Sequence, residues 1–267
     1  MAEEFFFLDK AQDFNVDEFE LNPIIKDHWQ KSKIFRKSPE NYKKKIQRLL
    51  ELLEFKEDIR ILDVGCGAGR TILELAFQGG RCVGIDATRD SIRLINAVKD
   101  QFKLVIKGIY CDACKLPFKS EMFDVVLSES FFEHVTDIDD AIKEQIRILK
   151  IGGRLYLSQA NFFNPWTLYD LLIKYPSRTK GEYGGIKWLL TKWKIRKNIY
   201  RMGWEGKDED IHTRFWWRKK IRQIPNLRVK SFISGLGNPS KGRLSFIKKI
   251  YSWLFDNIYI VAIKIGK

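Results

Sequence analysis

Three glycines at alternate positions follow a short apolar run that contains a single acid. Residues 59–70 read Ile-Arg-Ile-Leu-Asp-Val-Gly-Cys-Gly-Ala-Gly-Arg, with Asp63 two positions before Gly65. Glycine lets the backbone turn sharply or approach a ligand where a Cβ would collide, and a following helix directs free N–H groups toward such a turn. The segment therefore predicts a strand, a nucleotide-binding turn and a helix, with a ribose-bearing ligand.

The spacing of the glycines separates this turn from the turn that binds dinucleotides. Dinucleotide-binding folds use G-x-G-x-x-G and rest a pyrophosphate on the helix N-terminus. Here Gly65, Gly67 and Gly69 follow a G-x-G-x-G pattern, and the carboxylate of Asp63 would repel a pyrophosphate. We therefore expect a ligand with an ammonium or sulfonium group.

Two later strand-like runs also end in acids. Residues 81–86 end at Asp86, and residues 104–112 end at Asp112, before Ala113. In a doubly wound sheet the carboxyl ends of the strands lie at the ligand crevice. Asp86 is thus placed to accept from both ribose hydroxyls, and Asp112 from an adenine amino group.

The remaining segments complete an alternation of strands and helices. Residues 123–128 predict a fourth strand, and residues 137–150 a helix that Gly152 and Gly153 end before a strand at 154–159. The tail predicts a basic helix at 216–224 and strands at 227–234 and 257–265.

At these positions the chain resembles the class I S-adenosylmethionine-dependent methyltransferases. The residues that carry the resemblance are Leu-Asp-Val-Gly-Cys-Gly-Ala-Gly (62–69), Val-Gly-Ile-Asp (83–86), Cys-Asp-Ala (111–113), Leu-Pro-Phe (116–118), Phe-Asp-Val-Val-Leu-Ser (123–128), Glu-His-Val (133–135) and Leu-Lys-Ile-Gly-Gly-Arg-Leu (149–155). The resemblance implies a doubly wound, Rossmann-like α/β fold whose seven-stranded sheet is mostly parallel with an antiparallel last strand.

The resemblance also implies a cofactor, S-adenosyl-L-methionine, and a set of residues that bind it. They are Asp63, Gly65, Cys66, Gly67, Ala68, Gly69, Asp86, Ala87, Thr88, Asp112, Ala113, Ser128, Glu129 and Ser130. In the family the glycine turn wraps the amino-acid and ribose part of the cofactor, and the segment after the fourth strand lines the floor near the methyl group.

Two of the three histidines are candidate catalytic bases, because imidazole titrates near neutral pH. His134 follows the fourth strand and is the leading candidate, with a hydrogen-bonded cap of the next loop as its alternative role. His212 is the second candidate. Glu133 and His134 resemble part of a divalent-metal motif of ubiquinone-biosynthesis O-methyltransferases, but Ser130 stands where that motif has another acid. We expect no metal.

Length and composition predict one ample core with additions to it. The chain has 267 residues, of which 45% are hydrophobic. We expect an N-terminal helical extension (1–58), the cofactor-binding half of the methyltransferase domain (59–160), a lid or substrate cap (161–210) and the C-terminal part of that domain (211–267). The helical stripe at residues 46, 49, 50 and 53 belongs to the extension.

The cysteines and the chain start favour a cytoplasmic protein. Four cysteines, including the single C-x-x-C at Cys111 and Cys114, predict buried or adventitious thiols in a reducing compartment. Residues 1–10 lack the basic and long apolar regions of a signal peptide, and no run reaches membrane-spanning length.

The acceptor is the part of the reaction that the residues leave open. The formal net charge is +14, which suits either a solvated surface or an anionic partner. Residues 183–204 combine an apolar, tryptophan-bearing stripe with a basic face, which favours a lid over peripheral membrane contact or nucleic-acid contact. We expect a small-molecule acceptor methylated at oxygen, nitrogen or carbon. RNA, a lipid-like substrate and a catalytically silent cofactor-binding protein are the alternatives.

Overall fold

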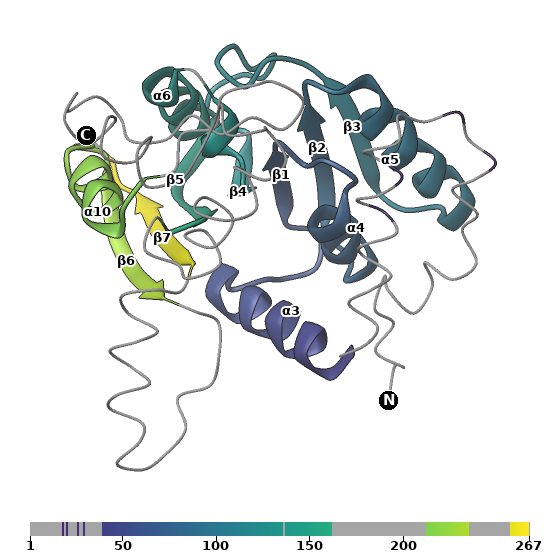
Figure 1. The fold of residues 1–267 in the computed structure, drawn as a ribbon, viewed down its shortest axis with the longest axis horizontal. Helices are drawn as coiled ribbons and strands as arrows, with labels where there is room; N and C mark the ends of the chain where they lie inside the picture. Colours follow the sequence, from purple (N-terminus) through teal and green to yellow (C-terminus); the bar gives the residue numbers. More distant parts are fainter. Residues whose placement is uncertain are drawn as a thin grey trace, which may run out of the picture. The chain divides into compact units, whose positions relative to one another are not determined.

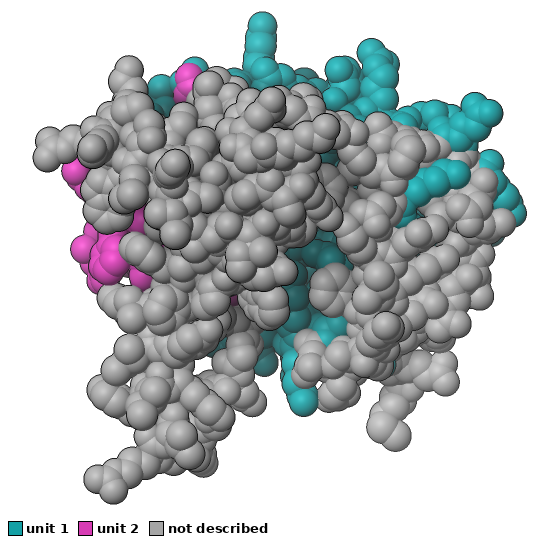
Figure 2. Space-filling model, viewed as in Figure 1, with its two compact units in different colours: residues 1–129, 139–156, 263–266 teal, residues 130–138, 157–262, 267 magenta. Residues whose placement is uncertain are grey.

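Strand β1 (Arg60–Val64) is an interior strand of the sheet and contains Asp63, the acid that precedes the glycine turn. The computed structural model describes residues 18, 20, 26, 29, 39–135, 137–161, 212–234 and 257–266. Two compact units are coloured in Figure 2, residues 1–129, 139–156 and 263–266 in the first and residues 130–138, 157–262 and 267 in the second.

Helices and strands alternate along the described chain. They are α3 (Pro39–Leu53), β1 (Arg60–Val64), α4 (Arg70–Phe77), β2 (Arg81–Asp86), α5 (Arg89–Phe102), β3 (Ile106–Tyr110), β4 (Phe123–Glu129), the 3₁₀ turn η3 (Phe132–His134), α6 (Ile138–Ile148), β5 (Leu149–Gln159), α10 (Arg214–Arg222), β6 (Leu227–Ser234) and β7 (Ile258–Lys264). This alternation is typical of an α/β fold with a largely parallel sheet.

The seven strands form one sheet in the order β3-β2-β1-β4-β5-β7-β6. Strand β1 pairs in parallel with β2 and β4, β2 pairs in parallel with β3, and β7 is antiparallel. The predicted doubly wound sheet with an antiparallel last strand is confirmed. From β1 the strand order runs through β2 to β3 toward one edge of the sheet, and from β4 it continues through β5 toward the other edge, so the winding changes direction between β1 and β4. Open α/β sheets bind ligands at this point.

Burial on both faces explains why the central strands are continuous apolar runs. Four of the five β1 residues and five of the seven β4 residues are buried. Helix α5 buries Ile92, Ile95 and Val98 along one stripe and contacts β2 and β3, and α4 contacts β2 (Figure 1). Helix α3 has a comparable stripe, in which Tyr42, Ile46 and Leu49 are buried.

The boundary between α6 and β5 differs from the prediction. Helix α6 ends at Ile148, and β5 already begins at Leu149, so Gly152 and Gly153 lie inside the strand. Gly152 has a φ of 80°, and a Cβ on Gly153 would lie 2.9 Å from the carbonyl oxygen of Asp124. The glycines therefore let the strand bend and pack closely, where the sequence suggested a helix terminator.

The second unit contains a cluster of aromatic rings around α10. The ring of Trp217 packs edge-on against Phe132 at 5.3 Å, and Trp216 stacks on His212 at 3.7 Å. Thr213 caps α10 by accepting a hydrogen bond from the N–H of Trp216. The basic helix starts two residues earlier than predicted.

None of the helices in the described residues is both long enough and apolar enough to cross a membrane. Most of the predicted lid, including residues 183–204, lies outside the described residues. The predicted four-part division of the chain stays a prediction.

Candidate functional site

The acids at the ends of β1 and β2 lie on one edge of the sheet because the two strands are parallel and in register. Asp63 pairs with Gly84, and the next pair joins Val64 to Ile85, one residue before Asp86. Asp86 in turn pairs with Tyr110 at the end of β3. The predicted gathering of strand-end carboxylates at this edge is therefore present in the structure.

The glycine turn is tied to β2 through its own N–H groups. The N–H groups of Gly65 and Cys66 both donate to the carbonyl of Ile85 at 2.9 Å, and that of Gly67 donates to Oδ2 of Asp86 at 2.9 Å. In a phosphate-binding turn such N–H groups stay free to donate to the ligand. Here the carboxylate of Asp86 already accepts from the N–H of Gly67. This arrangement agrees with the expected exclusion of a pyrophosphate.

Gly67 and Gly69 are glycines for different reasons. Gly67 has a φ of 52°, and an added Cβ would meet no described atom within 4 Å, so no described residue fills the space beside the turn there. Gly69 has a φ of 78°, and its Cβ would lie 2.7 Å from Cγ1 of Ile95. Gly67 therefore leaves room beside the turn, whereas Gly69 lets α4 approach α5.

A backbone hydrogen bond links the turn after β2 to the turn after β3. Oδ1 of Asp86 accepts from the N–H of Thr88, the exposed residue that precedes α5, and Ala87 is exposed beside it. The N–H of Cys111 donates to the carbonyl of Asp86 at 3.3 Å. Both Asp86 oxygens keep a second lone pair for a further donor.

Asp112 begins a tight turn on the same edge. Its Oδ1 accepts from the N–H of Cys114 at 2.9 Å, and its carbonyl accepts from the N–H of Lys115 at 3.2 Å. Asp112 is exposed and Ala113 is half-buried. The predicted adenine segment is therefore a structured turn with an accessible carboxylate.

Asp63 is the most buried carboxyl group of the edge, with a relative exposure of 3%. Burial raises the pKa of the Asp63 carboxyl well above its ordinary value, Glu129 and Asp86 raise it further, and the Lys45 ammonium lowers it only in part. A cation brought to this group would favour its ionised form. The edge is thus electrostatically suited to a cationic ligand.

Glu129 ends β4 and is held by three side chains. Lys45 Nζ of α3 lies 3.2 Å from Oε1, Thr71 of α4 donates its hydroxyl to Oε2, and the Tyr156 hydroxyl lies 3.4 Å from Oε1. Burial alone would raise the pKa of Glu129, but the charge of Lys45 and the hydrogen bond from Thr71 keep it below its ordinary value. Glu129 is therefore a fixed anion.

The other two residues of the predicted floor differ in exposure. Ser128 is fully buried, and its hydroxyl has no hydrogen-bond partner among the described residues. Ser130 is exposed, with a φ of 47° and its N–H donating to the carbonyl of Ser158 at 2.8 Å. This left-handed backbone conformation is strained for a serine, and residues strained in this way cluster at functional sites.

The candidate bases belong to the second unit. His134 is exposed and closes η3, with its N–H donating to the carbonyl of Phe131 at 3.0 Å. His212 is buried under Trp216, and its Nε2 has no partner within the described chain. Burial and, to a lesser extent, the charge of Lys220 lower the pKa of His212 to about 4, so its imidazole is neutral at physiological pH.

Glu133 is a titratable group that sequence reasoning did not propose as a base. Burial raises the pKa of its carboxyl to about 7, although hydrogen bonds from its own backbone N–H and from Ser130 oppose the rise. The spacing Ser130-x-x-Glu133 is that of a capping box, a signal present in the sequence.

Lys45 was also missed. It lies on the same stripe of α3 as the buried Tyr42, Ile46 and Leu49, three residues after the first of them. A lysine on an apolar stripe signals a buried anionic partner, since lysine is rarely buried unpaired. Residue types and spacing do not indicate which acid that partner is.

All four cysteines are free thiols. Burial, followed by the nearby carboxylates, raises the pKa of Cys66, Cys82 and Cys111. Within the described residues, no three His, Cys, Asp or Glu side chains come together as metal ligands would.

The chain is similar to methyltransferases by sequence and by fold. Residues 62–157 match the family model described as a methyltransferase domain. A ubiquinone biosynthesis O-methyltransferase of Pelagibacter ubique is 34% identical over 107 residues, which cover 39% of this chain and 43% of that protein. The chain spans about half the length, or less, of the curated relatives it matches.

Solved structures share the fold. A SAM-dependent methyltransferase from Methanosarcina mazei superimposes with a TM-score of 0.57 at 23% identity over 80% of this chain and 95% of that chain. Geranyl diphosphate C-methyltransferase from Streptomyces coelicolor, in complex with Mg²⁺, geranyl diphosphate and S-adenosyl-L-homocysteine, superimposes with a TM-score of 0.55 at 17% identity, over 83% and 78% of the two chains. The match over residues 62–157 and the shared fold thus make this chain similar to S-adenosylmethionine-dependent methyltransferases.

Proposed function

We propose that the protein is an S-adenosylmethionine-dependent methyltransferase that transfers a methyl group to oxygen, nitrogen or carbon of a small-molecule acceptor. The observation that carries the proposal is the buried carboxyl of Asp63, whose pKa burial, Glu129 and Asp86 all raise. Lys45 compensates an anion in that position only in part until a further cation arrives. The cofactor carries two cationic groups, an ammonium and a sulfonium, on its amino-acid end.

The residues around Asp63 fit the rest of the cofactor. No described residue fills the space beside Gly67, so a ligand can approach the backbone there. Both oxygens of Asp86 can accept from ribose hydroxyls. Asp112 and Ala113 supply an exposed carboxylate and a turn for the adenine edge. Cys66, Ala68, Ala87 and Thr88 complete the predicted contacts from the same two turns. S-adenosyl-L-homocysteine bound to a structural neighbour supports the same ligand class.

The methyl group supplied by the bound cofactor is electrophilic, so much of the rate can come from holding the acceptor in line and excluding water. For a hydroxyl acceptor, the proton that leaves the acceptor oxygen needs a base. Glu133, with a pKa of about 7, is suited to receive it at neutral pH. His134 and His212 remain the predicted alternatives, and the neutral imidazole of His212 can accept a proton only weakly because its pKa is about 4.

Small-molecule acceptors are favoured by the names of the relatives, which include ubiquinone biosynthesis and sterol methyltransferases. The predicted lid of residues 161–210 is the segment that we expect to select the acceptor. A cytoplasmic setting is in keeping with four free thiols. Peripheral membrane contact through residues 183–204 and an RNA substrate stay as alternatives.

Calorimetric titration with S-adenosyl-L-homocysteine tests the cofactor half of the proposal. Asp63→Asn keeps the shape of the side chain and removes its charge, so we expect a loss of affinity of about tenfold or more. Asp58→Asn is the matched control, since Asp58 lies before the start of β1, is 83% exposed and pairs only loosely with Arg81 at 3.2 Å. Equal affinities for the wild type and Asp63→Asn would reject the role of Asp63, and no binding by the wild type would reject the cofactor.

Methyl transfer is tested with cofactor labelled in its methyl group and three acceptor panels, namely small aromatic and polyprenyl molecules, lipid vesicles and RNA. We expect label in the small molecules. Label in RNA, with binding that weakens steeply as salt rises, would favour the RNA alternative. Cofactor binding without label in any panel would favour a silent cofactor-binding protein.

A further inference from the structure

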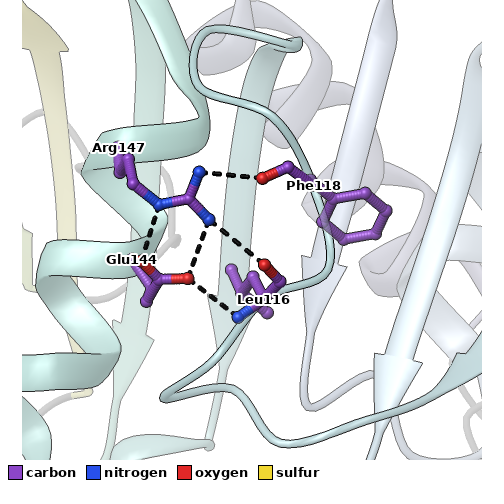
Figure 3. A network of polar contacts seen from close by, with 4 residues as sticks. All are labelled: Leu116, Phe118, Glu144 and Arg147. Carbon is purple, nitrogen blue, oxygen red and sulfur yellow. Dashed lines mark hydrogen bonds and ion pairs between the residues drawn. The ribbon is translucent and has the colours of Figure 1, made fainter.

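Two side chains of α6 bind the backbone of the segment that follows the Asp112 turn (Figure 3). Arg147 donates from Nη1 to the carbonyl of Phe118 at 2.8 Å and from Nη2 to the carbonyl of Leu116 at 3.2 Å. Glu144 accepts at Oε2 from the N–H of Leu116 at 2.8 Å. The pair therefore satisfies both backbone groups of Leu116.

Glu144 and Arg147 also bind each other, one helical turn apart. Arg147 Nε lies 2.6 Å from Oε1 of Glu144, and Nη2 lies 2.8 Å from Oε2. The two parallel hydrogen bonds fix the guanidinium plane, which lets the remaining donors point at the segment. Both side chains are partly buried, with 34% and 20% exposure, so solvent screens the pair only in part.

The segment between β3 and β4 contains no helix or strand over residues 111–122, so its shape depends on such contacts. Consecutive N–H groups serve different partners there. The N–H of Lys115 closes the turn on the carbonyl of Asp112, and that of Leu116 binds Glu144. The Leu116 side chain is itself buried at 4% exposure. The Asp112 turn is thus anchored to β2 at Cys111 and to α6 at Leu116.

We propose that Glu144 and Arg147 are positioning residues that hold the Asp112 turn in the shape that distinguishes adenine from other purines. The inference rests on the proposed function, because it takes the turn as the adenine-binding segment. The adenine amino group donates to a carboxylate, whereas hypoxanthine presents a carbonyl oxygen there, which a carboxylate repels. The preference depends on where the turn places its carboxylate, and the α6 pair sets that place.

The experiment compares S-adenosyl-L-homocysteine with S-inosyl-L-homocysteine by calorimetric titration. The two ligands differ only in the amino group and the adjacent N1, which become a carbonyl oxygen and an N–H in hypoxanthine. We expect the wild type to prefer the adenosyl ligand. In Arg147→Met, the affinity for the adenosyl ligand falls about tenfold, as for the loss of one charge-assisted hydrogen bond, while the affinity for the inosyl ligand changes little. The ratio of the two dissociation constants therefore shrinks.

Two further variants keep the test informative where Arg147→Met fails to fold. Arg147→Lys keeps the charge but reaches only one of the two carbonyl groups, and Glu144→Gln keeps the shape without the charge, so we expect intermediate ratios. Lys143→Met is the matched control, since Lys143 pairs with Asp140 at 2.8 Å with the same spacing on the same helix. It should leave the ratio unchanged.

The outcomes separate the positioning role from the function beneath it. Folded Arg147 and Glu144 variants with the wild-type ratio would overturn the role of the pair, as would an equal change of the ratio in Lys143→Met. A wild type that binds both ligands equally would overturn the adenine turn and the positioning role with it. A wild type that binds neither ligand would instead overturn the proposed function.

Discussion

The ion pair between Lys45 and Glu129 should stabilise the protein far more than the exposed ion pair on the same helix. Lys45 Nζ lies 3.2 Å from Glu129 Oε1, and the two side chains are 27% and 15% exposed. Lys45→Met keeps most of the aliphatic stem and removes the charge, which leaves Glu129 with the hydrogen bonds from Thr71 and Tyr156. The change therefore isolates the electrostatic contribution of the pair.

The size of the effect follows from the separation and the burial. Two unit charges at this distance attract by about 5 kcal/mol at an effective dielectric constant of about 20. Desolvation of the ammonium and its remaining exposure offset more than half of this, since exposed pairs contribute roughly 0–1 kcal/mol and loss of one partner of a buried pair costs roughly 3–5 kcal/mol. We expect Lys45→Met to lose about 2 kcal/mol of unfolding free energy at pH 7.

The pH dependence identifies the cause of the loss. The pKa of Glu129 is lowered in the folded protein, so its contribution is present above the unfolded pKa of about 4 and is lost as pH falls through the folded pKa. The difference between the wild type and Lys45→Met should therefore shrink toward zero as the pH falls below about 4. Urea unfolding at several pH values measures it.

Arg48→Met provides the control. Arg48 pairs with Glu51 at 2.9 Å on the same helix, with 49% and 54% exposure, and should lose no more than about 0.5 kcal/mol. Equal losses in the two variants at pH 7 would refute the reasoning. A loss in Lys45→Met that persists undiminished at low pH would show that packing, and not charge, is responsible.

Three further predictions concern the turn and the bases. The affinity for S-adenosyl-L-homocysteine should rise with pH through the raised pKa of Asp63, because its ammonium binds the ionised form, and calorimetry of Asp63→Asn should give a flat profile. Gly69→Ala should lower the free energy of unfolding, measured in urea, by about 2–4 kcal/mol, because Gly69 has a φ of 78° and an added Cβ would collide with Ile95. Gly152→Ala should lower it by only about 1 kcal/mol, because Gly152 has a φ of 80° but an added Cβ would meet no described atom within 4 Å. For a hydroxyl acceptor, kcat should rise through a pKa of about 7 in the wild type, and Glu133→Gln should lose that limb of the pH–rate profile; an unchanged limb would assign it to another group.

The parts of the site that could be predicted lie close together in sequence or at the ends of parallel strands. The positions of Asp63 and Asp86 follow from one rule, that the carboxyl ends of parallel strands meet at one edge. The glycine turn that follows Asp63 is a local motif, and its glycines indicate directly that the backbone adopts positive φ angles there. The sequence therefore sufficed to place these acids at one edge and to predict a seven-stranded sheet with an antiparallel last strand.

Contacts between distant segments could not be predicted, because residue types and their spacing do not indicate which polar groups meet. Thr71 and Glu129 are 58 positions apart, and the N–H of Leu116 meets Glu144 at 28 positions. The predicted start of β5 was wrong for a related reason. The apolar spacing of α6 continues into Leu149, and the helix ends at Ile148 only because the following residues pair as a strand.

The electrostatics of the edge link these two kinds of contact. Asp63 is destabilised as an anion by burial and by Glu129, and Glu129 stays ionised because α3 brings Lys45 to it. Were Glu129 neutral, the pKa of Asp63 would fall, so Asp63 would be ionised and able to bind a cation at a lower pH. Helix α3, which precedes the methyltransferase match, therefore contributes to the charge that the cofactor edge presents, so removal of α3 should shift the pH at which cofactor binding rises, even where residues 62–157 stay folded.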